Sequence, residues 1–283
     1  MQLSQRQPTA DQGAAPAAEP WQLAMFRHTL KKRQKLDALL ALLKPAGGRR
    51  CLLVTCGDNN GALNWHFKQH GGAWAWADAE PESRALIAEL TDDPVAAVDK
   101  AAPRLAFPDD AFDALITIDV HEHLERPALL NAELARLVRP GGVVIVTTPN
   151  GDEGKPANRI KRLLGMRPAD YGHIVAGYSA TELSQQLTAA GLEPYASASY
   201  ARFFTEMVEL TINVAYVKLL GRRGRAKARQ GQIAPQSKGQ IESVNKSYRM
   251  YARLYPLMRA IARLDWLDRS SWGYAVIVAA RKG

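Results

Sequence analysis

The sequence has little cysteine, no signal peptide and no long apolar run. Two of its 283 residues are cysteines, Cys51 and Cys56, so a disulfide framework is excluded and a reducing compartment is indicated. The segment before Trp21 lacks the apolar core of a secretory signal. No stretch has the roughly 20 uncharged apolar residues of a membrane-spanning helix. We therefore expect a cytoplasmic protein, with peripheral binding to the inner face of the membrane as an alternative.

Acidic residues are outnumbered by basic ones. The chain has 28 Asp and Glu residues against 37 Lys and Arg residues, a formal net charge of +9. This excess favours acidic partners such as nucleic acid, anionic lipid or phosphorylated substrates. Hydrophobic residues make up 47% and charged residues 23% of the chain, as in ordinary globular proteins. The length suffices for one sizeable α/β domain with an insertion.

The most informative stretch of the sequence runs from Phe107 to Asn150. Its apolar runs Ala114–Ile118 and Val143–Thr147 are continuous and rich in β-branched residues, as in strands buried on both faces of a parallel sheet. A helical segment, Pro127–Val138, lies between them. Pro140-Gly141-Gly142 is expected to stop this helix and to form a tight turn. The stretch therefore predicts a strand, a crossover helix, a turn and a second strand.

Several motifs here follow one another with a family's order and spacing: Phe107-Pro108-x-x-x-Phe112-Asp113, Glu122-His123-Leu124 and Leu137-x-Arg139-Pro140-Gly141-Gly142. The chain thereby resembles the class I S-adenosylmethionine-dependent methyltransferases, in particular the ubiquinone-biosynthesis-like type 11 group. The resemblance runs from roughly Arg50 to Tyr200 and resumes near the C-terminus. It implies an α/β, Rossmann-like fold with a seven-stranded, mostly parallel sheet whose last strand is antiparallel. It also implies S-adenosylmethionine as the cofactor.

Four segments follow from this comparison. Residues 1–20, rich in Gln, Ala and Pro, are expected to be a disordered tail, and residues 21–201 form the methyltransferase domain. Residues 202–271 are a basic helical insertion, and residues 272–283 supply the last strand. The domain is expected to begin with one helix over Trp21–Leu43, with Lys31-Lys32-Arg33 outward. In the family such a helix covers the cofactor or shapes the acceptor pocket.

The loop after the first expected strand, Cys51–Cys56, provides cofactor-binding candidates. Ligands bind at strand-end loops of open α/β sheets, and glycine lets the backbone approach them closely. The candidates are Cys56, Gly57, Asp58, which could bind the methionine ammonium, and Asn59.

This loop departs from the family pattern of an acid followed by Gly-x-Gly-x-Gly. Leu53 replaces the acid, Thr55 the first glycine and Asn59 the third. Asn tolerates a positive φ better than most residues, which would preserve the turn. The departure keeps a second hypothesis open, a degenerate S-adenosylmethionine-binding or non-catalytic interaction protein.

Acids after the next strands are expected to bind the adenosyl group. The strand Ala73–Ala77 ends at Asp78, whose two carboxylate oxygens suit the two ribose hydroxyls, although an exposed turn acid or helix cap is the alternative. The family's acid-x-x-Pro-Glu turn is matched by Asp78-Ala79-Glu80-Pro81-Glu82. This resemblance makes Ala79 a further cofactor-binding candidate. Asp99, after the short strand Val95–Val98, would lie beside the adenine. Asp119 and Val120 open the segment whose family counterparts touch the cofactor.

Three residues are catalytic candidates. His173, upstream of a Ser179/Glu182 capping box, lies in a loop that closes over the active site in the family, and is the preferred general base, with a structural role as the alternative. His121 is either a base or a surface histidine. Asn150, after the fifth strand, either contacts the acceptor or serves a turn. We expect no metal at His121-x-His123, because residues two apart on a helix point away from each other.

The insertion has two interpretations. Phe203–Leu220 and Ile241–Tyr255 are expected to be helices, the second continuing past Pro256 to Trp266, with a basic run over 222–229 between them. One interpretation is a helical lid on the sheet. The other is a membrane-interface element, because apolar helix faces, Trp, Tyr and clustered Lys and Arg favour an anionic lipid surface.

The sequence thus predicts methyl transfer from S-adenosylmethionine to an O, N or C nucleophile of a small-molecule or lipid-linked acceptor. The sulfonium is a good leaving group, so alignment and desolvation suffice unless the acceptor must lose a proton. A nucleic-acid methyltransferase is a weaker alternative, because the sequence has no recognition module and no Asn-Pro-Pro-aromatic motif. The acceptor and the oligomeric state are not indicated.

Overall fold

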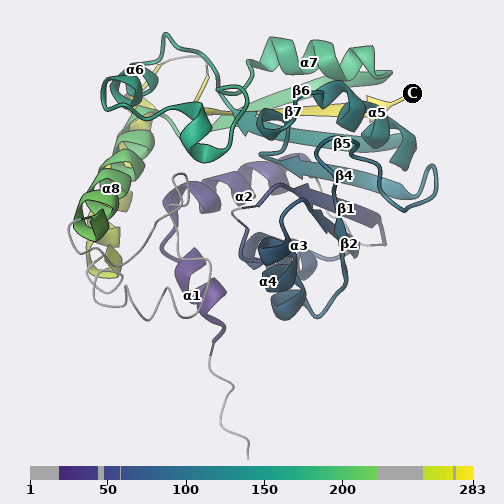
Figure 1. Cartoon of the computed structure of the whole chain (residues 1–283), viewed down its shortest axis with the longest axis horizontal. Coiled ribbons are helices and arrows are strands. Elements are labelled where there is room, and N and C mark those ends of the chain that lie inside the picture. The colour runs from purple at the N-terminus through teal and green to yellow at the C-terminus, as the bar shows by residue number, and fades with distance from the viewer. Residues whose placement is uncertain (1–18, 44–47, 58, 222–250, 270–271) are drawn as a thin grey trace, which may run out of the picture.

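A computed structural model describes residues 19–43, 48–57, 59–221, 251–269 and 272–283. Seven strands form one sheet in the order β3-β2-β1-β4-β5-β7-β6 (Figure 1). β7 is antiparallel to both of its neighbours, and the other strand pairs are parallel. This confirms the predicted fold. The strands are β1 (Arg50–Thr55), β2 (Ala73–Asp78), β3 (Val95–Ala97), β4 (Phe112–Ile118), β5 (Val138–Pro149), β6 (Leu192–Tyr200) and β7 (Ala275–Lys282).

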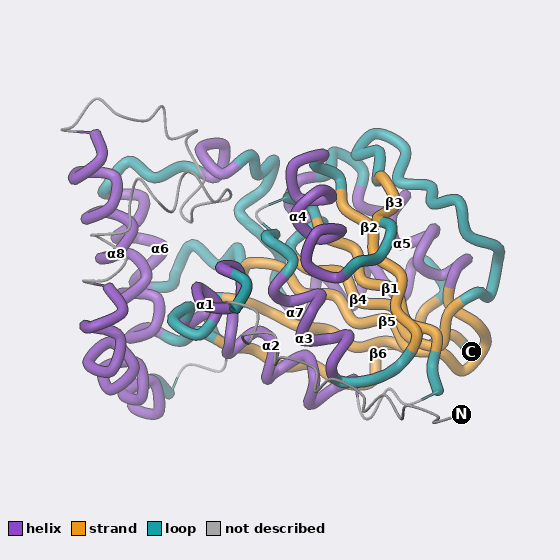
Figure 2. Tube along the Cα trace, turned by 90° about the horizontal axis from the view of Figure 1, so that it is seen from below, coloured by secondary structure: helices purple, strands orange, loops and turns teal. Residues whose placement is uncertain are grey.

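Helices cover both faces of the sheet (Figures 1 and 2). Alternate residues of β1 point to opposite faces, so Leu52 packs in one core cluster and Leu53 in the other. The first cluster contains side chains of α5 and α7, and the second those of α1 to α4. The helices are α1 (Trp21–Phe26), α2 (Leu30–Leu43), α3 (Ala62–Gln69), α4 (Pro81–Thr91), α5 (Pro127–Leu137), α6 (Pro156–Leu163), α7 (Ala180–Ala189) and α8 (Phe203–Gly221), with 3-10 turns η1 (His121–His123), η2 (Pro168–Tyr171) and η3 (Arg263–Leu267).

Two local predictions need correction. The single helix expected over Trp21–Leu43 is broken into α1 and α2, and between them the amides of His28 and Thr29 bond only three residues back, to Met25 and Phe26 (3.0 Å each). Pro140-Gly141-Gly142 falls within β5, which already begins at Val138 rather than after the turn. The chain still turns here, since Gly141 has a φ of +73° and the pairing with β4 jumps from Phe112–Val138 to Ala114–Val143.

The insertion lies between β6 and β7 and contains α8, a helix over 251–262 and η3. Leu30 of α2, Val208 of α8 and Tyr255 share one buried cluster. Figures 1 and 2 show α8 beside α6 at one end of the molecule. The predicted tail, except for residues 19–20, and the basic run 222–229 lie outside the described residues. Among the described helices, none has the length and apolarity to cross a membrane.

A buried acid ties the insertion to the rest of the chain. Glu206 of α8 accepts hydrogen bonds from Lys31 of α2 (2.9 Å) and Lys161 of α6. Although burial opposes ionisation, these two ammonium groups lower the pKa of Glu206 to about 2. Lys31, predicted to point outward, is therefore partly buried against α8.

Candidate functional site

Three predicted residues meet at the carboxyl edge of the central strands. Thr55 at the end of β1 is in register with Asp78 of β2 and Ile118 of β4. Gly57, Asp78 and Asp119 follow or occupy these strand ends, on adjacent strands. The amide of Gly57 donates to the Asp78 carboxylate at 3.1 Å. This edge, where the chain order reverses between β1 and β4, is where open α/β sheets bind ligands.

Asp78 is completely buried and has internal partners. Its carboxylate accepts from the hydroxyl of Thr55, the amide of Gly57 and the amide of Glu80 (2.7 Å). Burial raises its pKa, and these hydrogen bonds oppose the shift. Thr55 therefore binds the acid from the place of the family's first glycine, and Asp78 fixes the turn. Its contact with a ribose stays a prediction.

Glu80, which was not among the sequence candidates, lies over this turn. A Cβ on Gly57 would lie 2.9 Å from the Cγ of Glu80, and Gly57 has a φ of +79°. The Glu80 carboxylate pairs with Lys100 at 2.6 Å, and its side chain is 46% exposed. Glu80 is therefore a solvent-accessible carboxylate beside the Gly57 backbone. The signal was present in the sequence, because Glu80 belongs to the same acid-x-x-Pro-Glu turn as Asp78.

The remaining loop candidates are braced internally. Burial raises the pKa of the Cys56 thiol to about 12, so it stays protonated at neutral pH. Asn59 donates to Asn64 (2.9 Å) and accepts from the amide of Gly61 (3.0 Å), so its side chain holds the loop. Asp58 lies outside the described residues.

The other cofactor candidates contribute little side-chain chemistry. The amide of Ala79 donates to the carbonyl of Thr55 (3.2 Å). Asp99 is exposed and accepts from the amide of Ala101 (2.9 Å), as in a turn. Val120 is completely buried, and its carbonyl accepts from the amide of His123 (3.0 Å). The placement of Asp99 beside an adenine stays a prediction.

Asp119 forms an ion pair that the sequence did not reveal. It has a φ of 51°, in the left-handed region, and its carboxylate accepts from Lys35 of α2. Lys35 is largely buried, with 10% of its side chain exposed. Desolvation lowers the pKa of Lys35, but the charge and hydrogen bond of Asp119, together with Tyr200 and Glu122, raise that pKa overall. The Lys35 ammonium group is therefore paired with a carboxylate at the end of β4.

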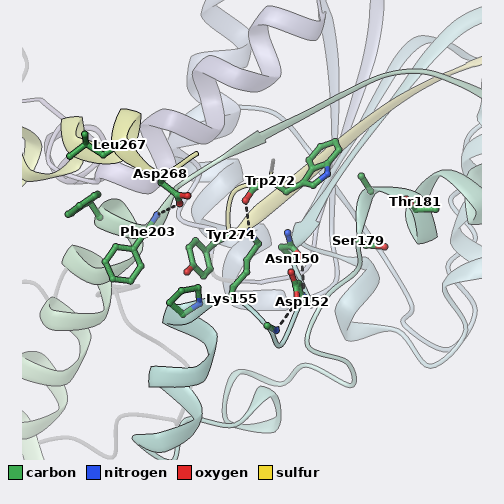
Figure 3. A pocket seen from close by; sticks show the side chains of 14 residues that line it. Asn150, Asp152, Lys155, Ser179, Thr181, Phe203, Leu267, Asp268, Trp272 and Tyr274 are labelled. Carbon is green, nitrogen blue, oxygen red and sulfur yellow. Dashed lines mark hydrogen bonds between the residues drawn. The ribbon is translucent and has the colours of Figure 1, made fainter. Parts of the chain in front are cut away.

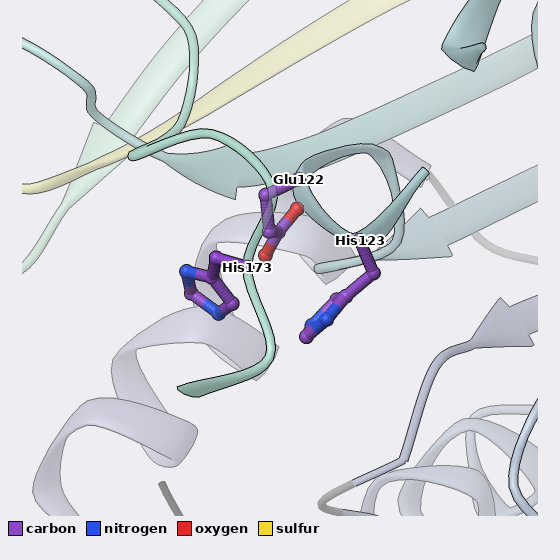
Figure 4. A group of neighbouring side chains, drawn as sticks. All are labelled: Glu122, His123 and His173. Carbon is purple, nitrogen blue, oxygen red and sulfur yellow. The ribbon is translucent and has the colours of Figure 1, made fainter. Parts of the chain in front are cut away.

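Glu122, His123 and His173 place one potential metal-binding atom each within 4.8 Å of one another (Figure 4). His123 Nδ1 lies 2.9 Å from the carbonyl of Gly172, which orients the ring. The buried Glu122 accepts from Thr148 with one oxygen, while the other has no partner among the described residues. Burial, followed by the charge of Asp119, raises the pKa of Glu122 to about 8. One carboxylate and two imidazoles are a donor set that suits a divalent transition ion. The sequence analysis had weighed a metal site at a different pair, His121 and His123.

The two candidate bases differ in environment. His121 is completely buried, and its Nε2 lies 2.8 Å from Asn131 Oδ1. Burial lowers its pKa to about 4. The ring is therefore not on the surface, and that prediction was wrong, whereas its role as a base stays a prediction. His173 is half-buried and contacts the ring of His123 edge-on at 4.6 Å. Burial, and then His123, lower its pKa to about 4, so it is neutral at pH 7. Its role as a base stays a prediction.

Asn150 lines a cavity of about 780 Å³ beyond the end of β5 (Figure 3). Its amide group donates to the carbonyl of Gly273 (2.9 Å), and its oxygen accepts from the amide of Asp152 (3.0 Å). Asn150 thus serves a turn, and its contact with an acceptor stays a prediction. Lys155 donates to the carbonyl of Trp272 in the cavity wall. Four of its 14 lining residues are aromatic, Phe203, Phe204, Trp272 and Tyr274, and the others include charged and small side chains. We call it the aromatic cavity.

Comparisons with known proteins agree with this architecture. A family model described as a methyltransferase domain matches residues 42–197. The 2-methyl-6-phytyl-1,4-hydroquinone methyltransferase of Synechocystis sp. is 28% identical over 171 residues, which cover 56% of this chain and 53% of that protein. A ubiquinone biosynthesis O-methyltransferase of Azorhizobium caulinodans is 28% identical over 137 residues, covering 47% of this chain and 53% of that protein. The chain spans about half the length of these curated relatives.

Solved structures share the fold at low sequence identity. An S-adenosylmethionine-dependent methyltransferase from Mesorhizobium loti has a TM-score of 0.51 at 17% identity, over 87% of this chain and 96% of that one. Phosphoethanolamine N-methyltransferase 2 of Haemonchus contortus, in complex with S-adenosyl-L-methionine, has a TM-score of 0.53 at 15% identity, over 88% of this chain and 52% of that one. The cyclase SpnF has a TM-score of 0.53 at 19% identity, over 88% of this chain and 81% of that one. At such identities the likeness concerns the fold alone.

Proposed function

The chain belongs to the methyltransferase domain family, and we propose that it transfers a methyl group from S-adenosylmethionine to a small-molecule acceptor. One observation carries the proposal: Gly57, Asp78 and Asp119 lie at the carboxyl ends of the neighbouring strands β1, β2 and β4, with Gly57 bonded to Asp78. A cofactor with an adenosyl group and a methionine end needs such an edge, because two strand-end loops and an acid must face it together.

The residues of this edge fit the cofactor in part. Gly57 leaves no room for a side chain beside Glu80, so its backbone forms a cradle that a Cβ would fill. The Asp78 oxygens already hold this cradle. Glu80 is the more exposed carboxylate. We infer that it accepts hydrogen bonds from the ribose hydroxyls after its ion pair with Lys100 has opened. When bound, the cofactor would supply the methyl group on a sulfonium leaving group.

The acceptor would be aligned by the other side of the edge. Lys35, held cationic beside Asp119, suits an oxygen that bears negative charge. His173 is neutral at pH 7 and can accept a proton from an acceptor hydroxyl, although a pKa of about 4 makes it a weak base. The aromatic cavity beside Asn150 suits an acceptor with a ring or an apolar tail. This supports a small-molecule O-methyl acceptor, including one linked to a lipid.

Calorimetric titration with S-adenosylmethionine and S-adenosylhomocysteine tests the proposal. We expect the chain to bind both, and Gly57→Ala to weaken binding at least about tenfold, because the new Cβ meets Glu80 and strains the left-handed backbone. Gly141→Ala is the matched control, since Gly141 also has a positive φ (+73°) but nothing within 4 Å of its Cβ position. No binding of either ligand to the unaltered chain would end the proposal.

A second candidate is a protein that binds the cofactor without transferring its methyl group. Two contacts at the altered loop favour this candidate. Thr55, in the place of the family's first glycine, bonds to Asp78, and the Glu80–Lys100 pair lies over Gly57. Incubation with S-adenosylmethionine and metabolite extracts separates the two. Formation of S-adenosylhomocysteine supports the transferase, and binding without any product supports the second candidate.

A further inference from the structure

The helix over 251–262 and the following η3 expose a row of large apolar side chains. Their exposed fractions are 43% for Leu254, 60% for Leu257, 37% for Ile261, 38% for Leu264 and 74% for Trp266. The first four are spaced by three and four residues, so they share one side of a helix. The opposite side is buried: Tyr255 and Ala262 pack with Leu30 and Val208. We call the five exposed residues the apolar stripe.

The exposed charges of the segment 251–269 have one sign. The segment 251–269 has four arginines, all of them exposed: Arg253, Arg259, Arg263 and Arg269. Its two acids point inward and hold the start of α8. Asp265 accepts from the amide of Phe204 (2.8 Å), and Asp268 accepts from the amide of Phe203 (3.2 Å). The outward surface of this segment is therefore apolar and cationic.

We propose that the apolar stripe docks on an anionic lipid bilayer. Apolar side chains enter the boundary between headgroups and acyl chains, Trp266 suits the interface, and arginines bind lipid phosphates. A second copy fits less well, because a two-fold contact would bring the arginines of both copies together. Nucleic acid would match the arginines but would leave the exposed leucines without a partner. The docking does not depend on the proposed function.

The position of the stripe adds a consequence that does rest on the proposed function. Leu267 follows the stripe, is 49% exposed and also lines the aromatic cavity, together with Asp268. The segment that carries the stripe therefore reaches the cavity, where Figure 3 shows Leu267 and Asp268. On a docked chain the cavity opens next to the lipid, and a lipid-linked acceptor reaches it without crossing water.

Sedimentation of the full chain with vesicles tests the docking. The probes are phosphatidylcholine vesicles with and without phosphatidylglycerol, each at low and physiological salt. We expect binding to the phosphatidylglycerol vesicles that weakens as salt rises. The double variant Leu257→Glu/Trp266→Glu should lower it at least about tenfold, and the triple variant Arg253→Gln/Arg259→Gln/Arg263→Gln by a similar factor. Leu163→Glu is the matched control, because Leu163 is 87% exposed on α6, outside the stripe.

Three outcomes would overturn the proposal. They are no sedimentation with anionic vesicles at low salt, undiminished sedimentation of the double variant, and a dimer in analytical ultracentrifugation that the double variant dissociates. The last result would assign the stripe to a second copy. The substituted side chains are exposed, so thermal unfolding should match that of the unaltered chain. Cofactor titration of the same variants keeps a failure of docking distinct from a failure of the proposed function.

Discussion

The two halves of the carboxyl edge hold their charges differently. On the side of β1 and β2, the buried Asp78 accepts three hydrogen-bond donors, and the charged pair Glu80–Lys100 is half-exposed. On the side of β4, Lys35 and Asp119 form a pair in which the lysine is buried, and Glu122 has an oxygen without a described partner. The first half is a turn fixed by hydrogen bonds, and the second contains an ion pair with a buried lysine.

This difference fits the different requirements that methyl transfer would place on the cofactor side and on the acceptor side of the edge. A cofactor that is bound and released in every cycle needs a rigid turn whose exposed carboxylate meets water between cycles. An acceptor needs groups whose protonation is set by burial rather than by solvent. The comparison therefore predicts that substitutions near β4 change stability most, whereas those at Glu80 change cofactor affinity alone.

The largest expected effect is that of Asp119→Asn. The substitution leaves Lys35 buried without its counter-charge, and Asn tolerates the left-handed backbone at this position. We expect the free energy of unfolding in urea to fall by about 3 kcal/mol. Lys100→Met, in the half-exposed pair of the other half, should cost less than about 1 kcal/mol. Equal losses would show that the two halves do not differ in this way.

Asp78→Ala should have the next largest effect. It leaves the amides of Gly57 and Glu80 without their acceptor, which should lower the free energy of unfolding by about 2 kcal/mol. Binding of S-adenosylmethionine should weaken by about 1–3 kcal/mol. Asp99→Ala, at an exposed acid beyond β3, is the control for stability. A loss of affinity in Asp78→Ala without a loss of stability would mean that Asp78 contacts the ribose directly.

The Glu122 carboxyl predicts a dependence of stability on pH. Its pKa is about 8 in the folded chain and 4.5 as the ordinary value. Between these pH values the unfolded chain has lost this proton and the folded chain retains it. The unfolded state is therefore increasingly favoured as pH rises from 4.5 to 8. The stability that Glu122→Gln gains over the unaltered chain should be larger at pH 6.5 than at pH 5 by on the order of 2 kcal/mol. The free energy of unfolding would be measured in urea at several pH values. If it depends on pH in the same way in Glu122→Gln and in the unaltered chain, Glu122 is ionised in the folded chain.

Continuous apolar runs made most of the sheet predictable. Ala114–Ile118 and Val143–Thr147 were predicted as buried strands, and they lie within β4 and β5. The strand over residues 275–282, far from β6 in sequence, revealed the insertion. The break after Phe26 was missed, although Thr29, a residue type that often precedes a helix, stands directly before α2.

The site was less predictable, because its contacts join distant segments. Lys35 and Asp119 are 84 residues apart, and no local pattern marks them as a pair. His121 and His123 are two residues apart, yet one faces Asn131 and the other faces His173. Motif spacing could locate the strand ends, but only tertiary packing decides which side chain of a motif is buried.

Glu80→Gln should have the smallest effect on stability and isolates the cofactor's ribose contact. The side chain is 46% exposed and its ion pair with Lys100 is equally accessible, so the free energy of unfolding should change by less than about 0.5 kcal/mol. A charged acceptor for the ribose hydroxyls is lost, so the Kd for S-adenosylmethionine should rise about tenfold, or 1.4 kcal/mol. Lys100→Met is the matched control, because it removes the competing partner and should not weaken binding. If calorimetry finds Glu80→Gln unchanged and Asp78→Ala impaired, the ribose is bound by the buried acid, and the turn must then open to admit the cofactor.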